Sequence, residues 1–137
     1  MYHIEFVPHM ADVRMVIKAD SQKEVFKGAL AGMNDLIKKD FCDQNKPTEL
    51  VNELRIHSPE TSCLLVDFLN EVLSLSHINK AIYCEVEFVR LGSTDMVGKV
   101  TGTSAEDWNE DIKAVTYHEA ELIKMKDGWT AKVLFDV

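Results

Sequence analysis

The chain closes with two strand-like segments, KAVTYHEAEL at residues 113–122 and WTAKVLFDV at residues 129–137. Between them stands Asp127-Gly128, a dipeptide that readily adopts the positive φ angles of a type I′ hairpin turn. If these two residues form the loop, Lys126 pairs with Trp129 and the register of the whole hairpin is fixed. The sequence therefore predicts a closing antiparallel hairpin around which the rest of the chain is organised.

The register predicted in this way places the apolar residues of both strands on one face, as a half-buried sheet requires. The facing pairs on that side are His118 with Val137, Ala120 with Phe135, and Leu122 with Val133. On the other face Glu119 falls opposite Asp136, and like charges that face each other directly destabilise an antiparallel pair. The carboxylate of Val137 adds a third negative group nearby. Three such groups either point apart into water or share a cation.

The composition is that of a soluble globular protein, because 46% of the 137 residues are hydrophobic and 28% are charged. A chain of this length usually forms one domain with one core, so residues 1–137 are predicted to be a single domain. The formal net charge of −8 argues against sequence-independent binding to nucleic acid, which depends on Lys and Arg neutralising phosphates. It is compatible with docking on a basic protein surface or with holding a hard cation.

The three cysteines, Cys42, Cys63 and Cys84, include no CxxC pair. We therefore expect free thiols in a reducing compartment, and neither a disulfide framework nor a zinc site. The N-terminal residues have no basic region that leads into an apolar segment, so no signal peptide is predicted. No apolar run is long enough to span a membrane. These features together favour a cytoplasmic protein.

Alternating apolar residues predict strands at residues 2–7, 13–19, 50–56, 82–91 and 96–103, besides the two strands of the closing hairpin. A capping box at residues 21–24 predicts a helix that runs to about residue 39, and a second helix follows residues 58–60. Residues 41–47 are expected to be a polar linker. The order β-β-α-β-α-β-β-β-β predicts an α+β fold, in which two amphipathic helices pack on a mostly antiparallel sheet.

The sequence contains no Gly-rich phosphate loop, nucleophile elbow or HExxH helix, and its histidines show no zinc-ligand spacing. What remains is a group of carboxylates at strand ends. Asp12 ends a tight connection between the first two strands, and Asp136 ends the last strand. From position alone, a turn cap explains Asp12 and a solvated strand end explains Asp136 equally well.

Four segments carry a resemblance to a known family: HMAD at residues 9–12, LLVDFLNEVL at residues 64–73, KAVTYH at residues 113–118, and the ending GW…FDV at residues 128–137. Together, and in this order, they resemble the archease family over essentially the whole chain. The resemblance implies a protein cofactor of the RtcB-type RNA ligase, which joins RNA ends in tRNA splicing and RNA repair. Such a cofactor promotes guanylylation of the ligase and repeated turnover, and is not itself an enzyme.

The resemblance also implies which residues are functional. A divalent cation is expected between Asp12, Asp136 and the terminal carboxylate of Val137, all of them hard oxygen donors that suit Ca²⁺, with Mg²⁺ or Mn²⁺ as alternatives. Lys113 is expected at the interface with the ligase. Glu24 is fully explained by the capping box and is added as a second interface candidate. Sequence-specific nucleic-acid binding and membrane contact are not expected.

The chain departs from the family pattern around residues 76–80 and at two positions that flank Asp12. The family usually has Thr where Met10 stands and Gly where Arg14 stands. Arg14 is therefore expected to alter the rim of the site or to pair with one of its acids. Glu119 is not a ligand position in the family, which leaves its part in metal binding open.

Two other functions remain open from the residues alone. One is a small metal-dependent α+β enzyme of the pterin type, although the sequence lacks a His-x-His pair and a placed cysteine nucleophile. The other is a chaperone-like interaction module in which any metal serves only the structure. Adding the purified protein to a stalled RtcB-type ligase would distinguish these functions.

Overall fold

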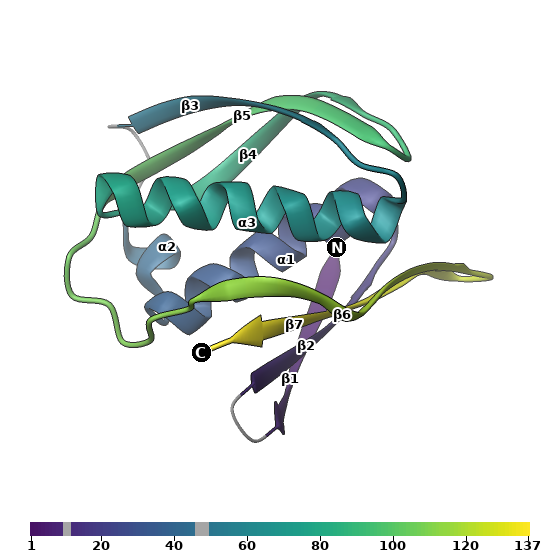
Figure 1. Ribbon diagram of the computed structural model, residues 1–137, viewed down its shortest axis with the longest axis horizontal. Coiled ribbons are helices and arrows are strands. Elements are labelled where there is room, and N and C mark those ends of the chain that lie inside the picture. Colours follow the sequence, from purple (N-terminus) through teal and green to yellow (C-terminus); the bar gives the residue numbers. More distant parts are fainter. Residues whose placement is uncertain (10–11, 46–49) are drawn as a thin grey trace.

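The computed structural model describes residues 1–9, 12–45 and 50–137, whose strands form two antiparallel sheets with two long helices between them (Figure 1). The first sheet has the order β1 (Tyr2–His9), β2 (Asp12–Ala19), β7 (Gly128–Asp136), β6 (Ala114–Met125). The second has the order β3 (Leu50–His57), β5 (Asp95–Ser104), β4 (Ala81–Leu91). The helices are α1 (Gln22–Ile37), the short α2 (Phe41–Gln44) and α3 (Thr61–Asn79).

The predicted α+β class and the predicted order of strands and long helices are confirmed. The prediction of a polar linker at residues 41–47 is partly wrong, because this segment contains α2. Phe41 begins α2 and is only 8% exposed, so burial of this one aromatic side chain explains why the chain folds back here. Met10 and Pro47 lie outside the described residues.

Helix α1 begins as the capping box predicts, with the Ser21 hydroxyl accepting a hydrogen bond from the Glu24 backbone N–H at 3.2 Å. Its apolar stripe packs on the first sheet. Gly28 lies so close to the ring of Tyr2 that an added Cβ would stand 2.8 Å from Cγ. The close packing of α1 against β1 therefore requires a glycine at this position.

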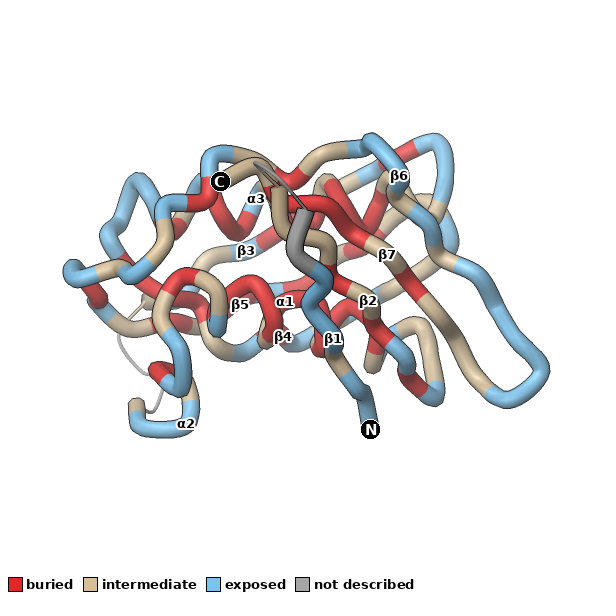
Figure 2. The backbone as a smooth tube through the Cα atoms, turned by 90° about the horizontal axis from the view of Figure 1, so that it is seen from below, coloured by how far each residue is buried: buried red, intermediate tan, exposed pale blue. Residues whose placement is uncertain are grey.

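Helix α3 is buried on a wide surface because both sheets pack against it. Its buried positions are Leu64, Leu65, Val66, Phe68, Leu69, Val72, Leu73 and Ser76. Phe68 stacks against Phe26 of α1 at 5.5 Å and Phe88 of β4 at 5.9 Å, measured between ring centroids. In Figure 2 the buried residues (red) recur along the helices and along the strands that pack against them. Despite this burial, none of the described helices is long and apolar enough to cross a membrane.

The central pair of the first sheet is β2 with β7. Their inward-facing residues, Met15, Ile17, Ala131, Val133 and Phe135, are at most 1% exposed. Because successive strand residues point to opposite faces, a slip of one residue would turn this whole set toward solvent. The register of β2 against β7 is therefore fixed by the core.

The predicted register of the closing hairpin is wrong. Met125 pairs with Gly128, so Lys126 and Asp127 form the loop and Lys126 does not pair with Trp129. Gly128 begins β7 with φ +144°, and a Cβ there would stand 2.6 Å from the Ala19 carbonyl oxygen. The glycine is required by this close approach to β2. The hairpin tip projects away from the core as an exposed arm (Figure 2).

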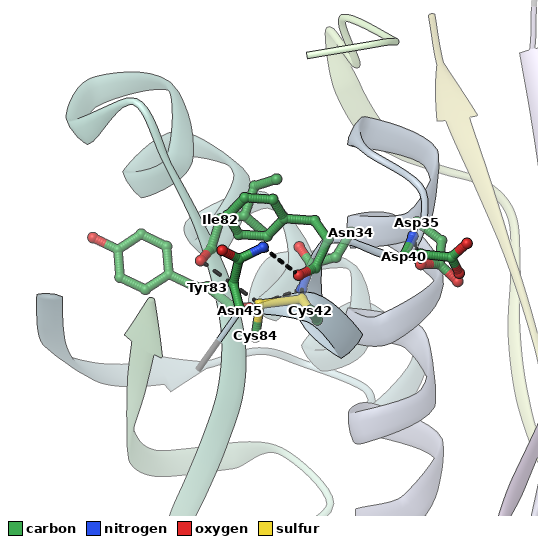
Figure 3. The surroundings of a disulfide bond; sticks show 9 residues. Asn34, Asp35, Asp40, Cys42, Asn45, Ile82, Tyr83 and Cys84 are labelled. Atoms are coloured by element: carbon green, nitrogen blue, oxygen red, sulfur yellow. Dashed lines mark hydrogen bonds between the residues drawn. A yellow bond between two sulfur atoms is a disulfide. The ribbon is translucent and has the colours of Figure 1, made fainter. Parts of the chain in front are cut away.

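A disulfide joins Cys42 of α2 to Cys84 of β4, with 5.5 Å between their Cα atoms (Figure 3). The prediction of free thiols is therefore wrong for these two residues, while Cys63 is free. The two bonded cysteines are 42 residues apart, and only the packing of α2 beside β4 brings them together. The buried side chain of Asn34 supports this junction by donating to the Tyr83 carbonyl at 2.8 Å and to the Cys42 Sγ at 3.7 Å.

The outer edge of β6 is closed by a side chain of α3. The Asn70 amide donates to the Val115 carbonyl at 2.7 Å and accepts from the Val115 N–H at 2.9 Å. Further along the same side of α3, the His77 ring nitrogen Nε2 lies 3.0 Å from the Ile112 carbonyl oxygen. Asn70 thus bonds to β6 as a neighbouring strand would, at an edge that would otherwise expose unpaired backbone groups.

Replacing Asn70 with Ala should lower the free energy of unfolding by about 2–3 kcal/mol, because both Val115 backbone groups lose their partner in a partly buried position. Urea unfolding measures this loss. Glu71→Ala, at the exposed next position of α3, is the matched control and should change stability by less than about 0.5 kcal/mol. Equal effects of the two substitutions would show that Asn70 does not hold β6.

Candidate metal centre

The two acids predicted from strand ends lie directly opposite each other. Asp12 of β2 is the Cα partner of Asp136 of β7, and Ala114 of β6 completes the row. Directly opposed residues of an antiparallel pair project to the same face, with their Cβ atoms about 4.5–5.5 Å apart. Both acids are half-buried. Two carboxylates are therefore held side by side on the outer face of the first sheet.

Val137 follows Asp136 directly, and its half-buried side chain packs against the core. This contact holds the main chain of residue 137 beside the two acids. Within residues 1–9, 12–45 and 50–137, no three His, Cys, Asp or Glu side chains converge as a metal-binding group. The third expected donor, the carboxylate of Val137, stays a prediction.

The donor chemistry fits a hard divalent cation. Carboxylate oxygens are the preferred ligands of Ca²⁺ and Mg²⁺, and no softer sulfur ligand is offered by Asp12, Asp136 or Val137. Two like charges in direct opposition destabilise a strand pair, and a cation between them would remove that repulsion. The row Asp12–Asp136 thus suits the cation that the sequence predicts.

Glu119 does not lie opposite Asp136, so this part of the predicted carboxylate group is wrong. Its side chain instead accepts a hydrogen bond from Arg14, with 2.9 Å between Arg14 Nη2 and Glu119 Oε2. Arg14 is two residues from Asp12 on the same face of β2. Arg14 therefore pairs with Glu119, an acid outside the predicted ligand set.

A large bulge in β6 brings Glu119 to this position. Residues 117–120 of β6 all lie opposite the single residue Val133 of β7, and Glu119 has a φ of +59°. His118 is exposed, so its predicted place in the core beside Val137 is wrong. Bulges of this kind re-aim side chains at the rims of functional sites. Leu134, which lies opposite Thr116 at the start of the bulge, is only 4% exposed.

The bulge is tied to α3 by a chain of hydrogen bonds. The Tyr117 hydroxyl donates to the Asp67 carboxylate, which also accepts from the buried hydroxyl of Ser58. The hydrogen bond to Asp67, together with some burial and the negative charge of Asp67, raises the pKa of Tyr117 to about 12. These hydrogen bonds were not predicted from the sequence. The only signal for them was the position of Asp67 on the polar side of α3, from which it could bond to a strand.

Lys113 lies at the same end of the sheet as the two acids. Its backbone N–H donates to the Asp136 carbonyl at 2.7 Å, and the residue is exposed. The structure therefore brings the first predicted interface residue next to the candidate metal centre.

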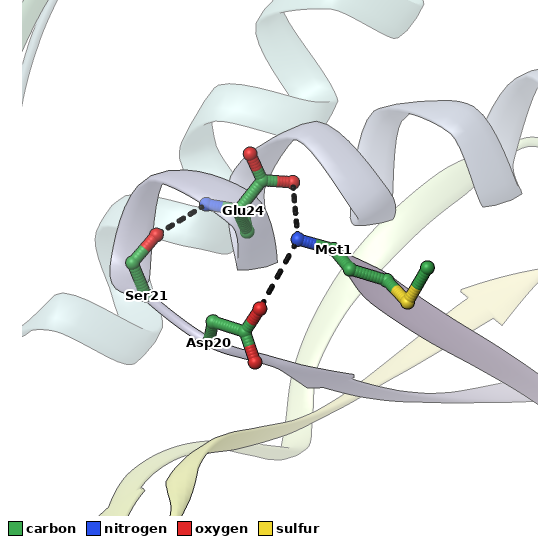
Figure 4. A network of polar contacts seen from close by, with 4 residues as sticks. All are labelled: Met1, Asp20, Ser21 and Glu24. Atoms are coloured by element: carbon green, nitrogen blue, oxygen red, sulfur yellow. Dashed lines mark hydrogen bonds and ion pairs between the residues drawn. The ribbon is translucent and has the colours of Figure 1, made fainter.

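Glu24, the second predicted interface residue, lies at the other end of β2. Its carboxylate is 3.6 Å from the Met1 ammonium group, which also pairs with Asp20 at 3.3 Å (Figure 4). Together with the Ser21 cap, these contacts account for Glu24 structurally. An open groove of about 570 Å³ lies at this same end, between the start of β1 and the hairpin tip. Neither feature is joined to the Asp12–Asp136 pair.

Comparison with known proteins gives a consistent assignment. The family model described as the Archease protein family (MTH1598/TM1083) matches residues 4–137. An archease from Methanosarcina acetivorans is 32% identical over 97% of this chain and 94% of its own length. One from Pyrococcus abyssi is 26% identical over 97% of both chains.

Two solved structures share the fold. The solution structure of Methanobacterium thermoautotrophicum protein 1598 superposes with a TM-score of 0.77, at 21% identity, over 98% of both chains. The crystal structure of a Thermotoga maritima protein, described as an archease and possible chaperone, gives a TM-score of 0.68 at 22% identity. It covers 96% of this chain and 94% of the other.

Replacing Asp67 with Asn should lower the pKa of Tyr117 from about 12 toward the ordinary tyrosine value, because the charged acceptor is lost. The Cζ chemical shift of Tyr117 measures this ionisation by NMR, with Tyr117→Phe to assign the signal. At pH 11 the parent tyrosine should remain mostly neutral, whereas the variant should be largely ionised. An unchanged titration would show that the Tyr117–Asp67 bond does not form in solution.

Proposed function

The chain belongs to the archease family, and from this premise we propose that it is a protein cofactor of an RtcB-type RNA ligase. In this proposal Asp12, Asp136 and the terminal carboxylate of Val137 together bind a divalent cation, with Ca²⁺ as the first candidate. The observation that carries the proposal is the direct opposition of Asp12 and Asp136 in the fixed register of β2 and β7. The ligase works on RNA in the cytoplasm, where the proposal also places this chain.

The residues at and around the Asp12–Asp136 pair have separate roles in this proposal. Asp12 and Asp136 bind the cation, and the packing of Val137 against the core keeps its carboxylate in place. When bound, the cation supplies concentrated positive charge at the surface of the protein. The exposed Lys113 stands beside this charge and is placed to contact an acidic or phosphate-bearing partner. The ligase supplies its own nucleophile, so the chain promotes guanylylation and repeated turnover without being an enzyme.

A chaperone-like interaction module is the second candidate, because the Thermotoga maritima relative of this fold is described as a possible chaperone. In that case the protein would keep the ligase soluble or folded, and any metal would serve only its own structure. A pterin-type enzyme is less well supported. Such an enzyme holds zinc with several histidines, and within the described part of the chain no such group of side chains converges.

Asp136→Asn should remove most of the calcium-dependent rise in melting temperature. A ligand at one hundred times its Kd stabilises the folded state by about 2.7 kcal/mol, which the parent should show in a thermal scan with Ca²⁺. Without calcium the variant should be more stable than the parent, because the like-charge pair is gone. Asp127→Asn, at the exposed hairpin tip, removes the same charge and should behave like the parent. A variant at position 136 with the parent's calcium response would mean that the site is misplaced.

Addition of this protein to a limiting, cognate RtcB-type ligase should increase the fraction of guanylylated ligase and let product exceed one turnover per enzyme. The assay joins cyclic-phosphate RNA ends with GTP and a divalent metal. Asp12→Ala and Lys113→Ala should lose this stimulation while remaining folded, because neither residue lies in the core. Lys126→Ala, an exposed lysine at the far end of the hairpin, should retain it.

Equal product yields with and without the protein would contradict the proposed function. If the protein instead prevents ligase aggregation without changing the guanylylated fraction, the chaperone-like function is the correct one.

A further inference from the structure

We propose that Glu119 holds the guanidinium of Arg14 away from the Asp12–Asp136 pair, and that this contact sets the affinity of the pair for a cation. The inference rests on the proposed function, because it concerns the same site. It assigns a positioning role to a residue of the β6 bulge that does not itself bind the cation.

Arg14 is a cationic side chain close to the two acids on the outer face. It follows Asp12 by two residues on β2, and its Cα partner Leu134 precedes Asp136 by two residues on β7. Residues two apart in a strand project to the same face and are about 6–7 Å apart. The side chain of an arginine spans that distance. Arg14 can therefore reach either acid by a change of rotamer.

The contacts of Arg14 show what directs it elsewhere. Nη2 lies 2.9 Å from the Glu119 carboxylate, and the side chain is only 25% exposed. Its Nε is buried and has no hydrogen-bond partner among the described residues. A guanidinium has five N–H donors in a fixed fork. In this arrangement at least the Nε donor of Arg14 makes no hydrogen bond to the described residues. Pairing with Asp12 and Asp136 would engage more of its N–H donors. Glu119 therefore competes with the two acids for the guanidinium of Arg14.

Glu119 reaches Arg14 because of its unusual backbone. The residue has φ +59°, a left-handed conformation that residues other than Gly, Asn and Asp seldom adopt. The bulge is held there by the bond from Tyr117 to Asp67 of α3. The placement of Glu119 is thus specified by the fold, and the position of the Arg14 charge follows from it.

The position of this charge matters for a divalent ion. An arginine paired with the two carboxylates would neutralise them and occupy the oxygens that a cation needs. An arginine paired with Glu119 does not occupy those oxygens. The Arg14–Glu119 contact therefore favours cation binding in a protein that carries an arginine beside its ligands.

The test is a double-substitution cycle read by calorimetric titration with Ca²⁺ in about 0.5 M KCl, where long-range effects of exposed charges are largely screened. Glu119→Gln should weaken calcium binding several-fold, because Arg14 is released onto the acids. Arg14→Gln should bind calcium at least as tightly as the parent. In the Arg14→Gln background, Glu119→Gln should change the affinity by less than about twofold, since there is no arginine to release.

Two matched controls distinguish an effect of the Arg14–Glu119 contact from an effect of net charge alone. Lys18→Gln removes a positive charge from the same face of β2, and Glu121→Gln removes the acid of another cross-strand ion pair, with Lys132. Both should leave the calcium affinity near that of the parent. The melting temperature without calcium reports whether each variant is folded. Arg14→Thr, which suits a strand, replaces Arg14→Gln in the cycle if the glutamine variant is unfolded.

If Glu119→Gln weakens binding by the same factor with and without Arg14, Glu119 acts only through its own charge and the inference fails. Failure of the parent to bind calcium at all would overturn the proposed cation site as well. The two results are distinguishable because the first requires a parent that binds.

Discussion

The antiparallel pairing of β2 with β7 fixes both the core and the candidate metal centre. Met15 and Ile17 of β2 and Val133 and Phe135 of β7 are almost completely buried, and they interlock in only one register. Since side chains alternate across a strand, that register also decides which residues meet on the outer face. Asp12 is opposite Asp136 because the core on the other side of the same two strands leaves no alternative.

The like-charge pair is thus maintained by packing energy from the opposite face. Burying each large apolar side chain contributes about 1.5–3 kcal/mol, whereas unfavourable cross-strand pairs involve about 1 kcal/mol or less. The core therefore outweighs the repulsion, and the strands cannot slip to relieve it. A locally unfavourable contact that the rest of the fold enforces is what a functional site commonly presents.

The elements of this fold could be predicted from sequence because they depend on local periodicity, caps and turns. The apolar stripes of α1 and α3 and the cap at Ser21 were sufficient to predict the two long helices. The hairpin register could not be predicted, because Gly128 is needed for a close approach to Ala19 of another strand. The disulfide between Cys42 and Cys84 was missed for the same reason. Both features are contacts between segments that are distant in sequence.

The bulge of β6 explains errors in both the predicted fold and the predicted site. Four residues opposite Val133 break the alternation on which the predicted pairing of Glu119 with Asp136 and of His118 with Val137 depended. The bulge is stabilised by the contact of Tyr117 with α3, which no local pattern encodes. The family resemblance predicts Asp12 and Asp136 as ligands without this information, but it could not place Glu119. The bulge puts that acid against Arg14, so the least predictable part of the hairpin determines the electrostatic surroundings of Asp12 and Asp136.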